Sequence, residues 1–148
     1  MIAGRETIPE AMPKKPLAKK LTREDKRNLD VEISFIEGVV RRDPGYVEAL
    51  QILGDDYTRR GRFTEGLTVD EQLAKLQPTD PTVLYNLACS YSLTDRLPEA
   101  AEALARSVAA GYTDLDWLTK DPDLKALREH PLYEKLRSKI KAAKSKSA

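Results

Sequence analysis

The stretch LQILGDDYTRRGRF, residues 50–63, decides the fold because its apolar and small residues return 34 positions later in LYNLACSYSLTDRL, residues 84–97. The offset pairs Leu50 with Leu84, Leu53 with Leu87, Gly54 with Ala88, Tyr57 with Tyr91, Phe63 with Leu97, Gly66 with Ala100 and Pro44 with Pro78. An internal period of this length is typical of stacked helix pairs. Each pair cannot bury its apolar face alone, so stacking on its neighbours completes the core.

Helix-spaced apolar residues and helix-stop signals predict helices throughout the chain after residue 20. The first helix is expected to start at Thr22 and to stop at Pro44–Gly45. The others are expected over about 46–60, 64–77, 81–94, 98–111, 121–130 and 131–142. Gly61, and Asp95 opposite it, fall where each pair must reverse direction. No stretch alternates convincingly at a period of two, so the chain is predicted to be all-α.

In this register the sequence resembles the tetratricopeptide repeat family. Residues 47–80 and 81–114 resemble full repeats, and residues 22–44 resemble the second helix of a preceding half repeat. Residues 115–142 resemble the degenerate ending seen after such arrays in bacterial proteins, with candidate covering residues Leu124, Leu127, Leu132, Leu136 and Trp117. The resemblance implies a right-handed α-solenoid of helix-turn-helix repeats with helical caps, folded from residues 21–142.

Three departures from the family pattern concern the second half of each repeat. Asp70 stands where an apolar or aromatic residue is expected, and Leu73 and Ala74 appear in reversed order of size. Tyr112 stands where a proline would close the second repeat. The helix over 64–77 is therefore expected to be rotated or locally irregular, with Asp70 solvated or salt-bridged. Two full repeats are fewer than the roughly three usually needed for stability, so the flanking helices must cap the stack.

Composition and charge favour a soluble protein of the cytoplasm. The chain has 148 residues, 25 basic and 24 acidic side chains and one cysteine, Cys89, which excludes an intramolecular disulfide. No segment reaches the length of a membrane-spanning helix, and the N-terminus lacks the apolar core of a signal peptide. Basic residues concentrate at the ends, so residues 1–20 are expected to be a flexible basic arm and residues 143–148 a flexible basic tail.

The resemblance also implies where a partner binds, because the first helix of each pair lines the inner, concave face of the stack. A peptide or partner helix is expected there. The candidate binding residues on that face are Glu48, Gln51, Asp55, Thr58, Tyr85, Asn86, Cys89 and Ser92. Asn86 matches the position where family members often hydrogen-bond a ligand's backbone. Tyr85 would add a flat apolar contact in the groove, but packing between helices is the favoured interpretation for Tyr85 and Cys89.

The charges on the inner face favour a basic partner. Glu48, Asp55 and Asp56 would form an acidic groove mouth that attracts lysine or arginine. One variant of the family binds the C-terminal carboxylate of heat-shock chaperones through lysines, arginines and asparagines. This sequence has Gln51 and Asp55 where that clamp would place a lysine and an asparagine, so no such ligand is expected.

Nothing in the sequence predicts an enzyme, a cofactor or a metal site. His130 is the single histidine and precedes Pro131 at a helix junction, and there is no phosphate-binding glycine loop and no plausible catalytic triad. The predicted function is a non-catalytic protein-interaction scaffold. One alternative is a self-associating structural subunit of a larger complex, and another is weak electrostatic binding of nucleic acid through the basic ends.

Overall fold

The structure, a computed structural model, describes residues 20–147. Every regular element in that range is helical, which confirms the all-α prediction. The elements are α1 (Arg23–Arg42), α2 (Val47–Arg59), α3 (Phe63–Leu76), α4 (Pro81–Leu93), α5 (Leu97–Ala109), α6 (Leu115–Leu118), the 3-10 turn η1 (Pro122–Leu124), α7 (Lys125–Arg128) and α8 (Leu132–Ser147). The predicted flexible arm over 1–20 lies, apart from Lys20, outside the described residues.

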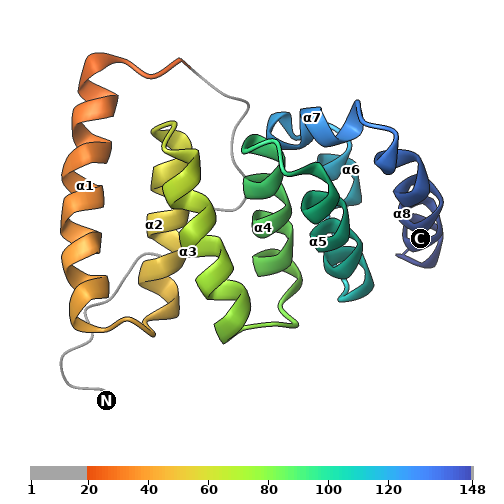
Figure 1. Cartoon of the computed structure of the whole chain (residues 1–148), viewed down its shortest axis with the longest axis horizontal. Coiled ribbons are helices and arrows are strands. Elements are labelled where there is room, and N and C mark those ends of the chain that lie inside the picture. Colours follow the sequence, from red (N-terminus) through yellow and green to blue (C-terminus); the bar gives the residue numbers. More distant parts are fainter. Residues whose placement is uncertain (1–19, 148) are drawn as a thin grey trace.

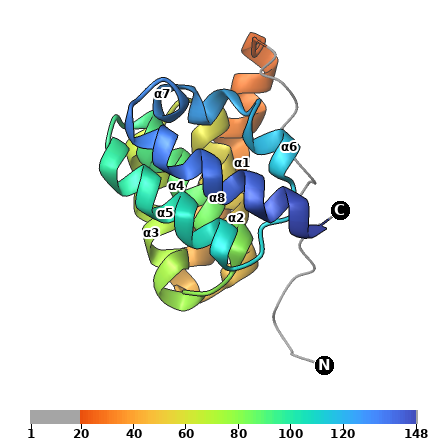
Figure 2. The same cartoon turned by 90° about the vertical axis from the view of Figure 1, so that its right-hand side faces the viewer.

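The helices are stacked in consecutive pairs, as expected for a helical repeat solenoid (Figure 1). α2 packs on α3 and α4 packs on α5, while α3 joins the two pairs by packing on α4. α1 packs on α2 at one end of the stack, and α8 packs on α5 at the other. Figure 2, seen from the α8 end, shows α8 lying in front of the helix pairs. No helix within residues 20–147 is long and apolar enough to cross a membrane.

Local sequence signals fix where these helices begin and reverse. Thr22 and Asp25 form a reciprocal capping box at the start of α1, and the Asp80 carboxylate caps α4 ahead of Pro81. Gly61 and Asp95, which are 34 residues apart, both adopt positive φ angles, of 84° and 61°. Glycine takes this conformation without steric cost, and aspartate tolerates it better than most residues. The predicted reversal of the chain at these two positions is confirmed.

The repeated positions form the core. The paired apolar side chains Leu50 and Leu84, Leu53 and Leu87 are all buried. Gly54 is small because α3 approaches closely: a Cβ atom there would lie 2.9 Å from Asp70 Oδ1. At the far end, Leu124, Leu127 and Leu136 are buried and Leu132 and Trp117 are half-buried. The predicted covering residues therefore do cover the end of the stack.

The expectation of a solvated Asp70 in a locally irregular helix is wrong. α3 is a regular helix, and Asp70 is buried in it rather than solvated. Its carboxylate accepts a hydrogen bond from Ser90 Oγ on α4. A buried carboxylate is tolerated where a hydroxyl satisfies it, and the absent side chain of Gly54 leaves it room.

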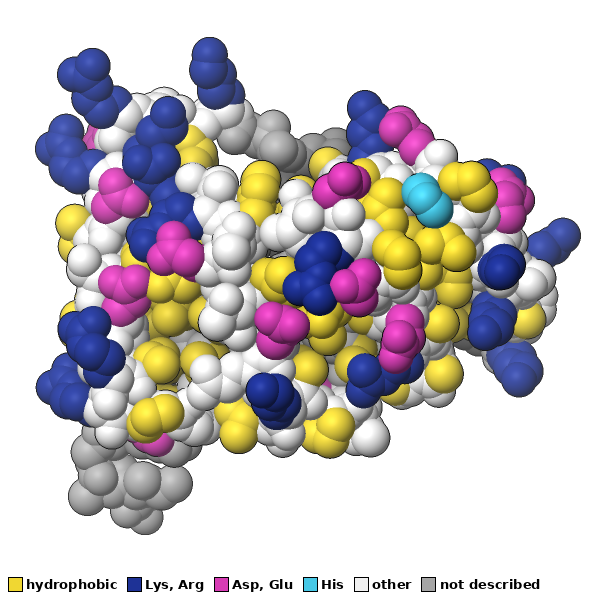
Figure 3. Space-filling model, in the orientation of Figure 1, with side chains coloured by type: hydrophobic (Ala, Val, Ile, Leu, Met, Phe, Trp, Pro, Cys, Tyr) yellow, Lys and Arg dark blue, Asp and Glu magenta, His cyan; other side chains and the backbone are white. Residues whose placement is uncertain are grey.

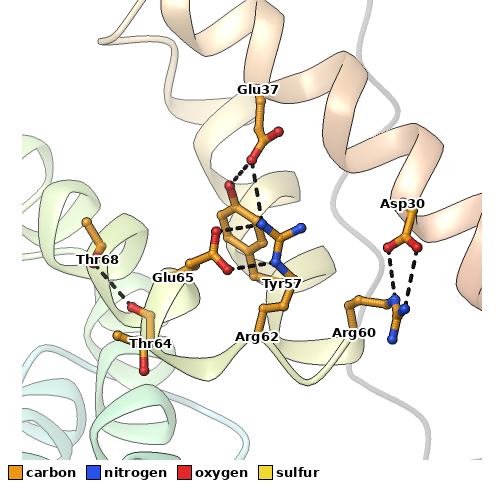
Figure 4. A network of polar contacts seen from close by, with 8 residues as sticks. All are labelled: Asp30, Glu37, Tyr57, Arg60, Arg62, Thr64, Glu65 and Thr68. Atoms are coloured by element: carbon orange, nitrogen blue, oxygen red, sulfur yellow. Dashed lines mark hydrogen bonds and ion pairs between the residues drawn. The ribbon is translucent and has the colours of Figure 1, made fainter.

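A polar clasp of four residues, Glu37, Tyr57, Arg62 and Glu65, ties α1 to the first helix pair (Figure 4). The Tyr57 hydroxyl donates to the Glu37 carboxylate. The Arg62 guanidinium lies 4.8 Å from the centre of the Tyr57 ring and donates to both Glu65 oxygens, at 2.7 and 2.6 Å. Burial, followed by the Glu37 hydrogen bond, raises the pKa of Tyr57. The hydroxyl therefore stays protonated and remains a donor.

The same clasp returns 34 residues later. Tyr91 donates to Glu71 at 3.1 Å, and the Arg96 guanidinium lies 4.9 Å from the centre of the Tyr91 ring. Arg96 also donates to Glu99 at 2.9 Å. Each tyrosine hydroxyl therefore bonds to the preceding helix, and each ring lies against the arginine that begins the second helix of its own pair.

The C-terminal region differs from the predicted helices. The expected helix over 121–130 is replaced by η1 and α7, and a short helix not foreseen, α6, precedes them. Pro122 removes an amide donor, and the Asp121 carboxylate accepts instead from Asp123 N at 2.9 Å. α8 continues to Ser147, beyond the expected end at Ala142. The alanines at 142 and 143 favour helix, and the lysines that follow suit its negative C-terminal end.

Candidate functional site

The structure divides the eight candidate binding residues into two groups. On α2, Glu48 is exposed and Gln51, Asp55 and Thr58 are half-buried. On α4, Asn86 is half-buried, whereas the other three are buried: Tyr85, Cys89 and Ser92. A partner can reach the four residues of α2 and Asn86. In this conformation it cannot reach the three buried residues of α4.

Tyr85 is buried by two residues from the C-terminal part of the chain. Its hydroxyl donates to Asp121 Oδ2 at 2.6 Å, and its ring stacks on Tyr112 with 4.2 Å between ring centres and planes only 4° apart. Burial, followed by the negative charges nearby, raises the pKa of Tyr85, so the hydroxyl stays protonated and can donate. The alternative of packing between helices is the one that the structure supports for Tyr85. The same contact gives Tyr112, which departs from the family pattern, a structural role.

Cys89 and Ser92 meet the same C-terminal segment. Cys89 Sγ lies 3.7 Å from Asp121 Oδ2, and Ser92 Oγ accepts a hydrogen bond from Leu127 N at 3.3 Å. The segment formed by η1 and α7 therefore covers this part of α4. We call this segment, residues 121–128, the inner cap.

One group of side chains has the composition of a metal site. Ligand atoms of Cys89, Asp121 and Asp123 lie within 4.8 Å of one another, and Cys89 and Asp121 are buried. Both Asp121 oxygens already accept hydrogen bonds, Oδ2 from Tyr85 and Oδ1 from Asp123 N. Donors within the chain therefore satisfy the buried Asp121 carboxylate without a metal ion. We therefore interpret Cys89, Asp121 and Asp123 as residues that anchor the inner cap to α4.

The acidic character of α2 is only partly at the surface. Asp56 was expected at the groove mouth with Glu48 and Asp55, but its side chain is buried. Burial, followed by the neighbouring Glu32 carboxylate on α1, raises the pKa of Asp56 to about 8. Asp56 therefore holds a proton at neutral pH and adds little negative charge to the groove. The acidic candidates that remain accessible are Glu48 and Asp55.

Thr58 is engaged within the helix pair. Its hydroxyl donates to the Gly54 carbonyl at 3.0 Å, and a Cβ atom at Gly66 of α3 would lie 3.2 Å from Thr58 Oγ1. The missing side chain of Gly66 therefore lets α3 lie against Thr58. The accessible polar candidates that remain are Glu48, Gln51, Asp55 and Asn86.

Comparison with known proteins finds distant similarities, and no family model matches the chain. It is 29% identical to a chloroplastic protein of Arabidopsis thaliana over 86 residues, which are 56% of this chain and 26% of that protein. It is 30% identical to the PEX5-related protein of Mus musculus over 100 residues, which are 68% of this chain and 16% of that protein. It is 34% identical to the peroxisomal targeting signal receptor of Komagataella phaffii over 80 residues, 53% of this chain and 14% of the receptor.

The chain thus spans about a quarter or less of the length of these relatives. The similarities, together with helix pairs that repeat every 34 residues, point to a tetratricopeptide-like repeat protein. A small, bacterial type of such a protein stays a prediction.

Proposed function

We propose that the chain is a non-catalytic protein-interaction module that holds a peptide or a partner helix on the inner face of its stack. The similarity to a protein named as a receptor for a targeting signal supports binding of a polypeptide. The observation that carries the proposal is the contrast along the inner face. The inner cap covers α4 at Tyr85, Cys89 and Ser92, while Glu48, Gln51 and Asp55 of α2 stay accessible, together with Asn86.

The chemistry of these residues favours a basic segment in an extended or helical form. Glu48 and Asp55 supply carboxylates that accept charge-assisted hydrogen bonds from lysine or arginine. The amide of Asn86 can donate to and accept from a peptide backbone at once. These carboxylates would repel the C-terminal carboxylate of a chaperone tail.

Reversing one of these charges should weaken the binding of a basic peptide. Peptides selected by the wild-type protein from a displayed library should be rich in lysine or arginine. Asp55→Lys should bind them about tenfold more weakly, because an attractive contact becomes a repulsive one. Fluorescence anisotropy with a labelled selected peptide measures the change.

The matched control is Glu102→Lys, the same change of charge at an exposed position of α5. Glu102→Lys should leave the affinity unchanged within about twofold. Equal losses in both variants would mean that only the overall charge matters. A library that yields no binder would likewise count against the proposal.

An exposed apolar pair on α1 favours self-association as a second candidate function. Val31 and Phe35 are 65% and 54% exposed. Phe35 lies 34 and 68 positions before Val69 and Ala103, which are both buried. The side chain at this repeat position is thus buried on α3 and α5, whereas on α1 it is exposed to solvent. A second copy of the chain could cover it.

Sedimentation equilibrium tests the second candidate. If α1 faces form the contact, a dimer should appear with rising concentration, and Val31→Glu with Phe35→Glu should weaken it by about tenfold or more. Leu76→Glu, at an exposed leucine of α3, is the control and should leave the dimer intact. A wild-type protein that stays monomeric at all concentrations would exclude this function.

A further inference from the structure

The α8 end of the stack carries a positively charged hollow, separate from the accessible candidate residues of α2. It has a volume of about 500 Å³ and is lined by Thr119, Arg128, Tyr133, Arg137, Ile140, Lys141 and Lys144. Four of these seven residues are cations, and three of those four come from α8. α8 as a whole holds six basic side chains and one acidic side chain. Figure 3 shows lysine and arginine side chains gathered over this end of the molecule.

One cation of the hollow, Arg128 at the end of the inner cap, is held in place by backbone carbonyls. The half-buried Arg128 donates from Nη1 to the Asp121 carbonyl at 2.7 Å and to the Leu118 carbonyl at 3.2 Å. These bonds fix the guanidinium but leave its charge unneutralised, because carbonyl oxygens carry only partial charges. A fixed guanidinium loses little entropy when it binds an anion.

Three of the cations lie close enough to Tyr133 to affect the pKa of its hydroxyl. Burial raises its pKa, while the charges of Arg128, Arg137 and Lys144 act in the opposite direction. The Arg137 guanidinium lies 5.9 Å from the centre of the Tyr133 ring. Three cations from two helices therefore lie near Tyr133, and Ile140 also lines the hollow.

Two acidic residues neutralise the hollow only in part. Lys144 lies 3.2 Å from Asp116, and Arg137 lies 3.5 Å from Glu134. The side chains of Asp116 and Glu134 are 86% and 68% exposed, and such exposed pairs contribute little to stability. Among the described residues, four cations against these two acids leave an excess of about two positive charges.

We propose that this hollow binds a phosphate group. A guanidinium with parallel donors, flanked by ammonium groups, matches the oxygens of a phosphate. A phosphate monoester also carries nearly two negative charges near neutral pH, close to the net charge of the site. The volume suits a small molecule or a headgroup. The phosphate could belong to a soluble ester or to a lipid.

Inorganic phosphate and pyrophosphate are the first probes, titrated into the whole chain by calorimetry at constant ionic strength. Pyrophosphate should bind more tightly than phosphate, because it carries more charge. Arg137→Gln combined with Lys141→Gln should weaken binding by about tenfold or more, since two charged donors are lost. Both side chains are exposed, so the variant should fold normally.

The matched control is Lys135→Gln combined with Lys139→Gln, which removes the same charge from exposed positions of α8 outside the hollow. It should change the affinity less than twofold. If both double variants lose the same affinity, the probes are attracted by the overall charge of α8 and not by a defined site, and the proposal is overturned. Absence of binding by the wild-type protein would overturn it directly.

A second arm separates the two sources of phosphate. Glycerol phosphate represents the soluble ester, and phosphatidylcholine vesicles with and without phosphatidic acid represent the lipid. Binding to either that is lost in Arg137→Gln with Lys141→Gln supports the site and identifies the source. If the protein binds neither glycerol phosphate nor the vesicles with phosphatidic acid, the hollow is not a site for a phosphate ester. None of these results depends on whether the inner face of α2 binds a peptide.

Discussion

Asp121→Ala should lower the free energy of unfolding by about 3 kcal/mol, a large effect for one polar residue. The Asp121 carboxylate is fully buried and accepts from the Tyr85 hydroxyl, while its other oxygen caps η1 through Asp123 N. Its removal leaves the Tyr85 hydroxyl buried without an acceptor and removes the cap. Urea unfolding followed by circular dichroism measures the loss.

A double-mutant cycle with Tyr85→Phe separates the hydrogen bond from general damage. Tyr85→Phe removes the hydroxyl that Asp121→Ala would strand, so the double variant should be more stable than the sum of the single losses by about 1–2 kcal/mol. Asp116→Ala, at an exposed aspartate of α6, is the control and should cost less than about 0.5 kcal/mol. Strict additivity at Asp121 and Tyr85 would contradict the role given to this bond.

The inner cap stands where a third helix pair would continue the stack. The 34-residue offset carries Leu53 to Leu87 and then to Asp121, which is followed by Pro122. A third regular first helix cannot form there, because the proline lacks a donor and crowds the preceding turn. The broken segment instead turns Leu124 and Leu127 into the core. The degenerate ending therefore closes the stack by folding onto the inner face.

The sequence predicted what is local and periodic. Gly61 and Asp95 were placed correctly because the offset aligns them, and the turn chemistry of each residue suits a reversal. The clasp residues could have been found by the same offset, since Glu37 and Arg62 return as Glu71 and Arg96. That signal lies in polar positions outside the apolar pattern and was missed.

Packing was foreseen for Tyr85 and Cys89, but the segment that covers them and Ser92 could not be predicted in this way. Their burial depends on Asp121 and Leu127, which belong to the segment where the repeat fails. Periodicity identifies the inner face of a helix, but only the path of the chain beyond the last repeat decides whether that face is covered. Asp70 was misjudged for a related reason, because Ser90 on another helix satisfies it.

The stability of the protein should fall as pH rises toward 8, and Asp56→Asn should remove most of that dependence. The pKa of Asp56 is raised from 3.8 to about 8 in the folded state by burial and by Glu32. Between these two values the folded state keeps a proton that the unfolded state has released. The free energy of unfolding therefore decreases with rising pH, by up to about 1.4 kcal/mol per pH unit for one such group.

Asp56→Asn cannot ionise, so we expect it to be about 2 kcal/mol more stable than the wild-type protein at pH 8, and the gain should shrink as pH falls toward 4. Urea unfolding at intervals across this range gives the slope. Glu32→Gln should reduce the slope in part, because one cause of the raised pKa disappears. Glu48→Gln, at an exposed carboxylate of α2 that does not act on the pKa of Asp56, should keep the wild-type slope. If Asp56→Asn keeps that slope too, Asp56 is ionised in the folded protein, and the contact between α1 and α2 holds a charge without a proton to neutralise it.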